Sequence, residues 1–115
     1  MSHYNAVLKV EDVFTITGRG TVVVGKVEKG EFHNGDMVTH INGSGTESEV
    51  FVQGLEMFHK TIERVQAGDN AGLLLGQWAE ETVTKGFFSK KTETIRKIVS
   101  PPRNSFQRGD LIVKL

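Results

Sequence analysis

The segment Gly20 to Lys26 comes nearest in this sequence to a motif with known chemistry. Its letters, GTVVVGK, fit the first part of a phosphate-binding loop. That loop needs a Ser or Thr hydroxyl after the lysine to hold magnesium, and backbone amides that wrap around a phosphate. Here Val27 follows the lysine, and three valines in the middle favour an extended strand. The sequence therefore predicts no nucleotide hydrolysis at this segment.

The other residues able to do chemistry lack the spacing that catalysis or metal binding needs. Gly18 and Gly20 begin a dinucleotide-binding fingerprint, but Val23 occupies the position of its third glycine. The absence of cysteine removes disulfides, thiol catalysis and cysteine-based zinc sites. No serine-hydrolase elbow occurs. The histidines, which show no metal-ligand spacing, are His3, His33, His40 and His59. We therefore expect a protein that is not an enzyme, with no metal and no cofactor.

Length and composition indicate a single domain without a membrane segment. The chain has 115 residues, enough for one core without crosslinks, and 14 basic residues balance 14 acidic ones. No apolar run approaches the length of a membrane-spanning helix, and the first five residues lack the pattern of a signal peptide. We expect a soluble cytoplasmic protein with no membrane partner.

Alternating apolar residues and regularly spaced turns predict an all-β protein. Thirteen glycines accompany many valines, threonines and isoleucines. The expected strands are residues 6–17, 21–28, 37–41, 46–53, a doubly buried 73–75, a segment around 87–88, 94–99 and 111–115. Residues 29–36 are expected to form a short exposed link, and residues 58–65 a helical turn or an irregular loop. Because so many short strands need covered edges, we expect a small closed or nearly closed β-barrel.

Two segments of the sequence resemble each other, and the C-terminal one belongs to a region that we expect to be integral to the fold. Residues 32–38 (FHNGDMV) and 106–112 (FQRGDLI) both place an aromatic residue three positions before a Gly-Asp turn. This indicates a shared turn chemistry rather than a true repeat. Residues 92–115, with apolar side chains such as Ile95 and Ile98, should contribute to the core because a chain of this size has little core to spare.

Basic residues are concentrated in the second half of the chain. The candidates for phosphate contact are Lys85, Lys90, Lys91, Arg96, Lys97, Arg103 and Arg108. They are interrupted by a single acid, Glu93. Such a run forms either a patch that contacts phosphates or outward strand positions that protect a sheet edge from aggregation. Both alternatives stay open at this point.

Residues 11–30 (EDVFTITGRGTVVVGKVEKG) strongly resemble the start of the second domain of elongation factor Tu. The likeness continues through Gly35-Asp36, residues 54–58 and residues 67–75, and spans about residues 11–91. It implies the β-barrel of translational GTPase second domains, with residues 92–115 as extra C-terminal strands. The GTPase domain and the third domain of that family have no counterpart in the sequence, so we expect a free-standing domain without a GTP switch.

In that family the barrel helps to hold the aminoacylated 3′ end of transfer RNA. The resemblance implies that Glu56 hydrogen-bonds the terminal adenosine, beside an apolar wall of Ile16, Val22 and Leu74. The residues that it places near the aminoacyl group are Glu11, Asp12, Phe14 and Asn70. His59 stands where the family usually has arginine, which weakens the support expected beside the adenosine. Without the resemblance, these residues would be interpreted as barrel core, a surface acid and a turn residue.

Three hypotheses about function follow from these observations. The first is a binding module for the 3′ end of aminoacyl-tRNA or for another translation component, such as ribosomal RNA or a translation protein. The second is a protein-interaction module that imitates a translation-factor surface to regulate or decoy a partner. The third is a structural domain without independent activity. A basic stripe running to Glu56 and Phe14 would favour RNA, and a large exposed apolar patch would favour a protein partner.

Overall fold

The structure is a computed structural model, and it describes residues 3–57, 60–85 and 91–115. For residues 83–85 and 91 it describes the backbone only. His59, Lys90 and the strand expected around residues 87–88 therefore lie outside the described residues.

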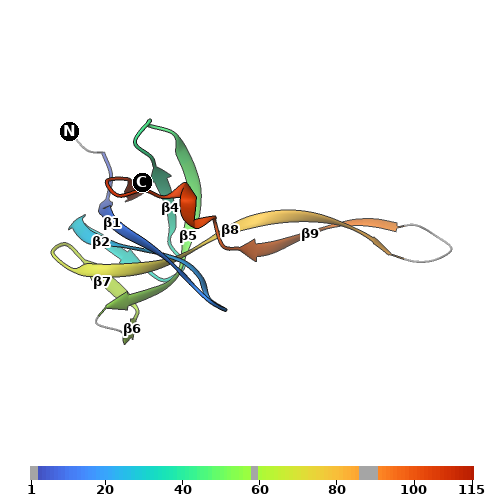
Figure 1. Ribbon diagram of the computed structural model, residues 1–115, viewed down its shortest axis with the longest axis horizontal. Helices are drawn as coiled ribbons and strands as arrows, with labels where there is room; N and C mark the ends of the chain where they lie inside the picture. The colour runs from blue at the N-terminus through green and yellow to red at the C-terminus, as the bar shows by residue number, and fades with distance from the viewer. Residues whose placement is uncertain (1–2, 58–59, 86–90) are drawn as a thin grey trace.

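Nearly all of the regular secondary structure in the described chain is β-strand, which confirms the expected all-β class (Figure 1). The elements are β1 (Ala6–Ile16), β2 (Gly20–Lys29), β3 (Glu31–His33), β4 (Met37–Ile41), β5 (Glu47–Met57), β6 (Lys60–Ile62), β7 (Arg64–Gln66), β8 (Asn70–Lys85), β9 (Lys91–Val99), the short 3-10 helix η1 (Arg103–Ser105) and β10 (Leu111–Lys114). None of the helices in these ranges is long and apolar enough to cross a membrane.

Six strands pair in a closed ring, in the order β1, β2, β8, β5, β4, β10 and back to β1. Every pairing around the ring is antiparallel. The strand that closes the ring is β10, which lies between β1 and β4. The C-terminal strand is therefore integral to the fold, and the expected small, closed arrangement of strands is confirmed.

The core fills the inside of this ring with side chains from the inner face of each strand. On β8, Leu73 and Leu75 are fully buried, whereas Leu74 faces the outside and is half-buried. The expectation that residues 73–75 form a doubly buried strand is therefore wrong, because this strand has an inner and an outer face. Ile112 of β10 and Leu8 of β1 are also fully buried.

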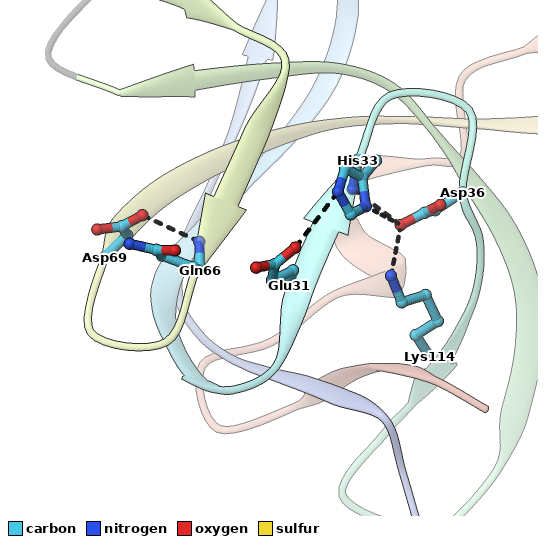
Figure 2. A network of polar contacts seen from close by, with 6 residues as sticks. All are labelled: Glu31, His33, Asp36, Gln66, Asp69 and Lys114. Carbon is cyan, nitrogen blue, oxygen red and sulfur yellow. Dashed lines mark hydrogen bonds and ion pairs between the residues drawn. The ribbon is translucent and has the colours of Figure 1, made fainter.

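A tight turn fixes the start of β4 against β5. Gly35 has a φ of 87°, a conformation that favours glycine. Its N–H donates to the carbonyl oxygen of Val52 at 2.7 Å, and the N–H of Val52 donates to the carbonyl oxygen of Asp36 at 2.9 Å. The carboxylate of Asp36 accepts from the N–H of His33 at 2.8 Å and from Lys114 Nζ at 2.9 Å (Figure 2). The turn thereby also binds β10.

The same turn occurs at two other places in the ring. The corresponding glycine, aspartate and anchoring valine are Gly68, Asp69 and Val27 in one turn, and Gly109, Asp110 and Val10 in the other. Each glycine N–H donates to its valine carbonyl oxygen at 2.8 Å, and each carboxylate accepts from the backbone N–H three residues earlier at 2.9 Å. Figure 2 shows the contact between Asp69 and Gln66. Residues 32–38 and 106–112 share this geometry, as the sequence indicates.

The sequence did not predict the three short strands β3, β6 and β7. Residues 29–36 were expected as an exposed link, but β3 pairs with β7 and its Phe32 is fully buried. Residues 58–65 were expected as a helical turn or loop, but they contribute β6 and the first part of β7. Strands of three residues are too short to show a period of two, which explains both errors.

Beyond Gly76, β8 leaves the ring and pairs only with β9 among the described residues, forming a two-stranded arm (Figure 1). The arm accounts for the elongated shape of the molecule, which measures 59 × 32 × 22 Å. Ile95 and Ile98 lie on it with 40% and 48% of their surface exposed. The expectation that both belong to the core is therefore wrong, although the strand itself is present.

Candidate functional site

The register of three strand pairs creates a row of side chains on the outer face of the ring. Phe14 of β1 lies opposite Val22 of β2, Val22 lies opposite Leu74 of β8, and Leu74 lies opposite Gly54 of β5. Residues directly opposite each other in antiparallel strands point to the same face. Three residues that the sequence resemblance singles out, Phe14, Val22 and Leu74, therefore lie side by side.

A second row runs beside the first on the same face. Asp12 lies opposite Val24, Val24 opposite Gly72, and Gly72 opposite Glu56. A Cβ atom on Gly72 would lie 3.2 Å from Val22 Cγ1 and 3.9 Å from Glu56 Cβ. The glycine therefore keeps a hollow open between the valines and the glutamate.

The two rows enclose a pocket of about 430 Å³. Five residues proposed from the resemblance line it, namely Phe14, Ile16, Val22, Glu56 and Asn70. The lining residues that sequence reasoning missed are Thr15, Val24, Met57, Ala71 and Gly72. Val24 was detectable in the sequence, because it lies two positions after Val22 on the same strand and so faces the same side. The pocket thus combines an apolar floor with one carboxylate and one amide side chain.

Glu56 is held by an ion pair with Arg19. Arg19 lies in the turn between β1 and β2, where its backbone N–H donates to the carbonyl oxygen of Ile16 at 3.0 Å. Both side chains are partly exposed, so this ion pair orients the carboxylate more than it stabilises the fold. Sequence reasoning missed the role of Arg19, because only the strand register brings it close to Glu56.

Three other residues from the resemblance do not line this pocket. Leu74 continues the apolar row beyond it. Glu11 is exposed at a β-bulge, where the register between β1 and β2 shifts. Asp12 lines a neighbouring depression of about 470 Å³, and its Oδ1 accepts from the N–H of Val13 at 2.8 Å. His59 lies outside the described residues.

The described side chains among the candidates for phosphate contact fall into two groups. Arg103 and Arg108 line the depression beside Asp12, and Arg103 Nε donates to the carbonyl oxygen of Val13 at 3.1 Å. Arg96 and Lys97 lie on the arm instead, where Arg96 stacks 4.8 Å from the centre of the Trp78 ring. Lys97 pairs with Glu81 at 2.7 Å, again on the arm. The side chains of Lys85, Lys90 and Lys91 lie outside the described part of the chain.

Two further polar clusters are structural in character. His40 Nε2 lies 2.8 Å from Asp110 Oδ2, both residues are buried, and the imidazole packs 4.4 Å from the ring of Phe106. The partly buried pair of Asp36 and Lys114 secures the turn before β4 (Figure 2). No group of three or more His, Cys, Asp or Glu in the described ranges is placed to hold a metal ion.

Comparison with known protein families shows what the chain is similar to. The family described as elongation factor Tu domain 2 matches residues 20–88, which is more than half of the chain. The matched region contains β2 and β5 and the start of β8, which supply Val22, Glu56, Asn70 and Gly72 of the pocket.

Proposed function

Because the chain belongs to the elongation factor Tu domain 2 family, we propose that it is a non-enzymatic binding module whose outer-face pocket receives the adenosine at the 3′ end of a transfer RNA. The observation that carries this proposal is the convergence of Phe14, Ile16, Val22, Glu56 and Asn70 on one pocket. These residues come from four different strands, and the pairing of those strands brings them together.

The chemistry of the pocket suits an unstacked purine nucleoside. Single-stranded RNA ends are recognised by flat apolar or aromatic surfaces combined with a few polar groups at base and ribose edges. Phe14 is 47% exposed and offers its ring for stacking, while Val22 and Val24 form the floor. The carboxylate of Glu56 accepts a hydrogen bond from the exocyclic amino group of adenine or from a ribose hydroxyl.

The surroundings of the pocket suit an attached aminoacyl group. Asn70 lies at the edge of the pocket, and its amide oxygen accepts hydrogen bonds. Asp12 and Glu11 precede Phe14 on β1, and both are exposed. Carboxylates near the pocket favour binding of a cationic α-amino group through charge-assisted hydrogen bonds. We assign this weaker role to the two acids because neither lines the nucleoside pocket.

We assign phosphate contacts to Arg103 and Arg108, which line the same depression as Asp12. Arg96 and Lys97 of the arm, together with Lys85, Lys90 and Lys91 of the sequence, would add a contribution that does not depend on the RNA sequence. Such contacts weaken as salt rises, because bound counterions are released when RNA binds. Discrimination of the RNA end is therefore assigned to Glu56, and general affinity to the arginines and lysines.

A protein partner is a second candidate, favoured by a strip of exposed apolar side chains away from the pocket. Met37 lies opposite Phe51, the Phe51 ring lies 5.7 Å from that of Trp78, and Trp78 lies opposite Ile98. Met37, Trp78 and Ile98 are each about half exposed. Exposed apolar patches of this kind mark protein interaction sites in many soluble proteins.

Fluorescence anisotropy with labelled transfer RNA tests the first candidate. Intact RNA and RNA trimmed of its terminal adenosine are titrated with the wild-type protein, Glu56→Ala and the matched control Glu47→Ala, which changes an exposed acid on the same strand. We expect only Glu56→Ala to abolish the preference for intact RNA, a loss of about 1 to 3 kcal/mol if the hydrogen bond is buried. An absence of binding at low salt would reject the RNA proposal and leave the protein-interaction module.

A further inference from the structure

The arm formed by β8 and β9 has an open edge along β9 among the described residues. Within the described residues, β9 is the last strand of its sheet, and residues 77–85 of β8 pair only with β9. A ribbon of two strands is marginally stable on its own in water, and an open strand edge presents unpaired N–H and C=O groups. A third strand along β9 would satisfy these groups.

The side chains of β9 alternate between the two faces of the arm. Ile95 lies opposite Glu81, and Lys97 lies opposite Ala79, so Ile95 and Lys97 share one face with Glu93. Ile95 is 40% exposed in the middle of this strand, although an isolated isoleucine gains nothing from contact with water. Its neighbours two positions away on either side carry opposite charges, Glu93 and Lys97.

We propose that two copies of the chain pair through the outer edges of their β9 strands, antiparallel and around a two-fold axis at Ile95. The two arms would then form one continuous four-stranded sheet. This contact is isologous, because the same edge is used by both copies, and such two-fold dimers are the commonest protein oligomers. Addition of a strand to an open edge is also a general mode of recognition.

The register of this pairing follows from symmetry and charge. A two-fold axis between antiparallel strands stands perpendicular to the sheet, so it passes through one residue position that lies opposite itself. An axis at Ile95 places Ile95 against Ile95 of the second copy and places Glu93 against Lys97 on both sides. An axis at Arg96 would place Arg96 against itself, and an axis at Thr94 would place Glu93 against Ile95. Opposite charges facing each other across strands stabilise a sheet, whereas like charges destabilise it.

A second copy is favoured over an unrelated strand because β9 is complementary to itself in this register. The ion pair between Lys97 and Glu81 of the same arm is compatible with the contact, since Lys97 would lie between two carboxylates. The pocket around Glu56 is built by β1, β2, β5 and the start of β8, so it stays accessible in the dimer. Dimerisation through β9 is therefore independent of the proposed RNA binding.

A pair of charge reversals tests the register. Glu93→Lys and Lys97→Glu each place like charges opposite each other twice in a dimer of identical chains. We expect each variant alone to dimerise roughly tenfold to a hundredfold more weakly than the wild type, measured by analytical ultracentrifugation across protein concentrations. A mixture of the two variants restores opposite charges at both positions, so it should form a heterodimer. The control Glu80→Lys changes an exposed acid on the other face of the arm and should leave dimerisation unchanged.

A cysteine crosslink supplies a second measurement that does not depend on charge. The natural sequence has no cysteine, so Ile95→Cys introduces a single thiol. Directly opposite residues in antiparallel strands have Cα atoms about 4.5 to 5.5 Å apart, within the range that a disulfide bridges. We expect Ile95→Cys to form a disulfide-linked dimer on mild oxidation, and Thr82→Cys on β8 to form no disulfide-linked dimer under the same conditions. A wild-type protein that stays monomeric at all concentrations, or a mixture of charge variants that fails to associate, would overturn the proposal.

Discussion

The guanidinium of Arg19 and the carboxylate of Glu56 form an ion pair beside the outer-face pocket. One residue comes from the turn after β1 and the other from the end of β5, so the pair depends on the pairing of β1, β2, β8 and β5. Its function in our account is to aim the carboxylate at the bound nucleoside.

Replacement of Arg19 by Met should therefore affect recognition more than stability. The pair is partly exposed, and such pairs contribute about 0 to 1 kcal/mol to folding. We expect a small change in thermal unfolding but a reduced preference for intact over trimmed transfer RNA. Calorimetry and anisotropy titration measure the two effects separately. A loss of stability with recognition unchanged would assign Arg19 a purely structural role.

Filling the hollow at Gly72 should block the pocket. In Gly72→Val, the new Cβ would lie 3.2 Å from Val22 Cγ1 and the side chain would project beside Glu56. We expect loss of binding to the RNA end, measured by anisotropy.

The matched control for this substitution is Gly54→Val on the first row. A Cβ there meets only Leu74, at an ordinary 3.8 Å, and Gly54 does not line the pocket. This variant should bind RNA as the wild type does. Equal loss of binding in both variants would point to a general disturbance of the sheet rather than to an occupied pocket.

The turn around Asp36 should make stability depend on acidic pH. Burial opposes ionisation of this carboxyl, but hydrogen bonds from Lys114 and from the N–H of His33 outweigh it, and its pKa is lowered below the usual 3.8. A group with a lowered folded-state pKa stabilises the protein fully above its unfolded-state pKa, and this contribution is lost as pH falls through the folded-state value. We expect Asp36→Asn to be about 1 kcal/mol less stable than the wild type at neutral pH.

The stability difference between the wild type and Asp36→Asn should shrink as pH falls below about 4. The wild-type carboxyl then becomes protonated and, like the amide of the variant, carries no charge. Denaturant unfolding of both proteins over this pH range measures it. Lys114→Met provides a matched control, since it removes the main donor and should weaken the same pH dependence. A stability difference that is constant down to strongly acidic pH would contradict this role for Asp36.

Substitutions in β10 and β9 should differ sharply in their effect on stability. Ile112 is fully buried in the strand that closes the ring, so Ile112→Ala should destabilise by about 2 to 5 kcal/mol. Ile98 lies half exposed on the arm, and Ile98→Ala should change stability by less than about 1 kcal/mol. Urea unfolding compares the two, and Ile112→Val serves if the alanine variant does not fold. Similar effects at both positions would show that the arm packs into the core.

The long strands of the ring were predictable from the sequence because their apolar residues alternate over many positions. Val50 and Val52 of β5, for example, are both buried as their spacing indicates. The sequence predicts a turn at residues 67–70, but not that it repeats the other two Gly-Asp turns, because buried Val65 stands where those two have phenylalanine. The exposure of Ile95 and Ile98 was also unpredictable, since an apolar residue in a strand gives no sign that the strand leaves the core.

At the candidate site, too, the residues identified from the sequence differ from those whose role depends on strand pairing. Family resemblance identified Glu56 and Phe14, and the structure places both at one pocket. It did not identify Arg19 or Gly72, whose positions depend on which strands pair and in which register. Asp12 and Glu11 were expected at the same site, but Glu11 lies at the bulge in β1 and Asp12 lines the neighbouring depression.

Backbone NMR spectra recorded during titration with a short single-stranded RNA that ends in a 3′ adenosine test the central claim most directly. Our account predicts that the largest shifts occur at the amides of Phe14, Ile16, Val22, Glu56 and Gly72, and that they are much smaller with an RNA that lacks the terminal adenosine. Shifts confined to Trp78, Ile98 and Met37, or equal shifts with both RNAs, would contradict it.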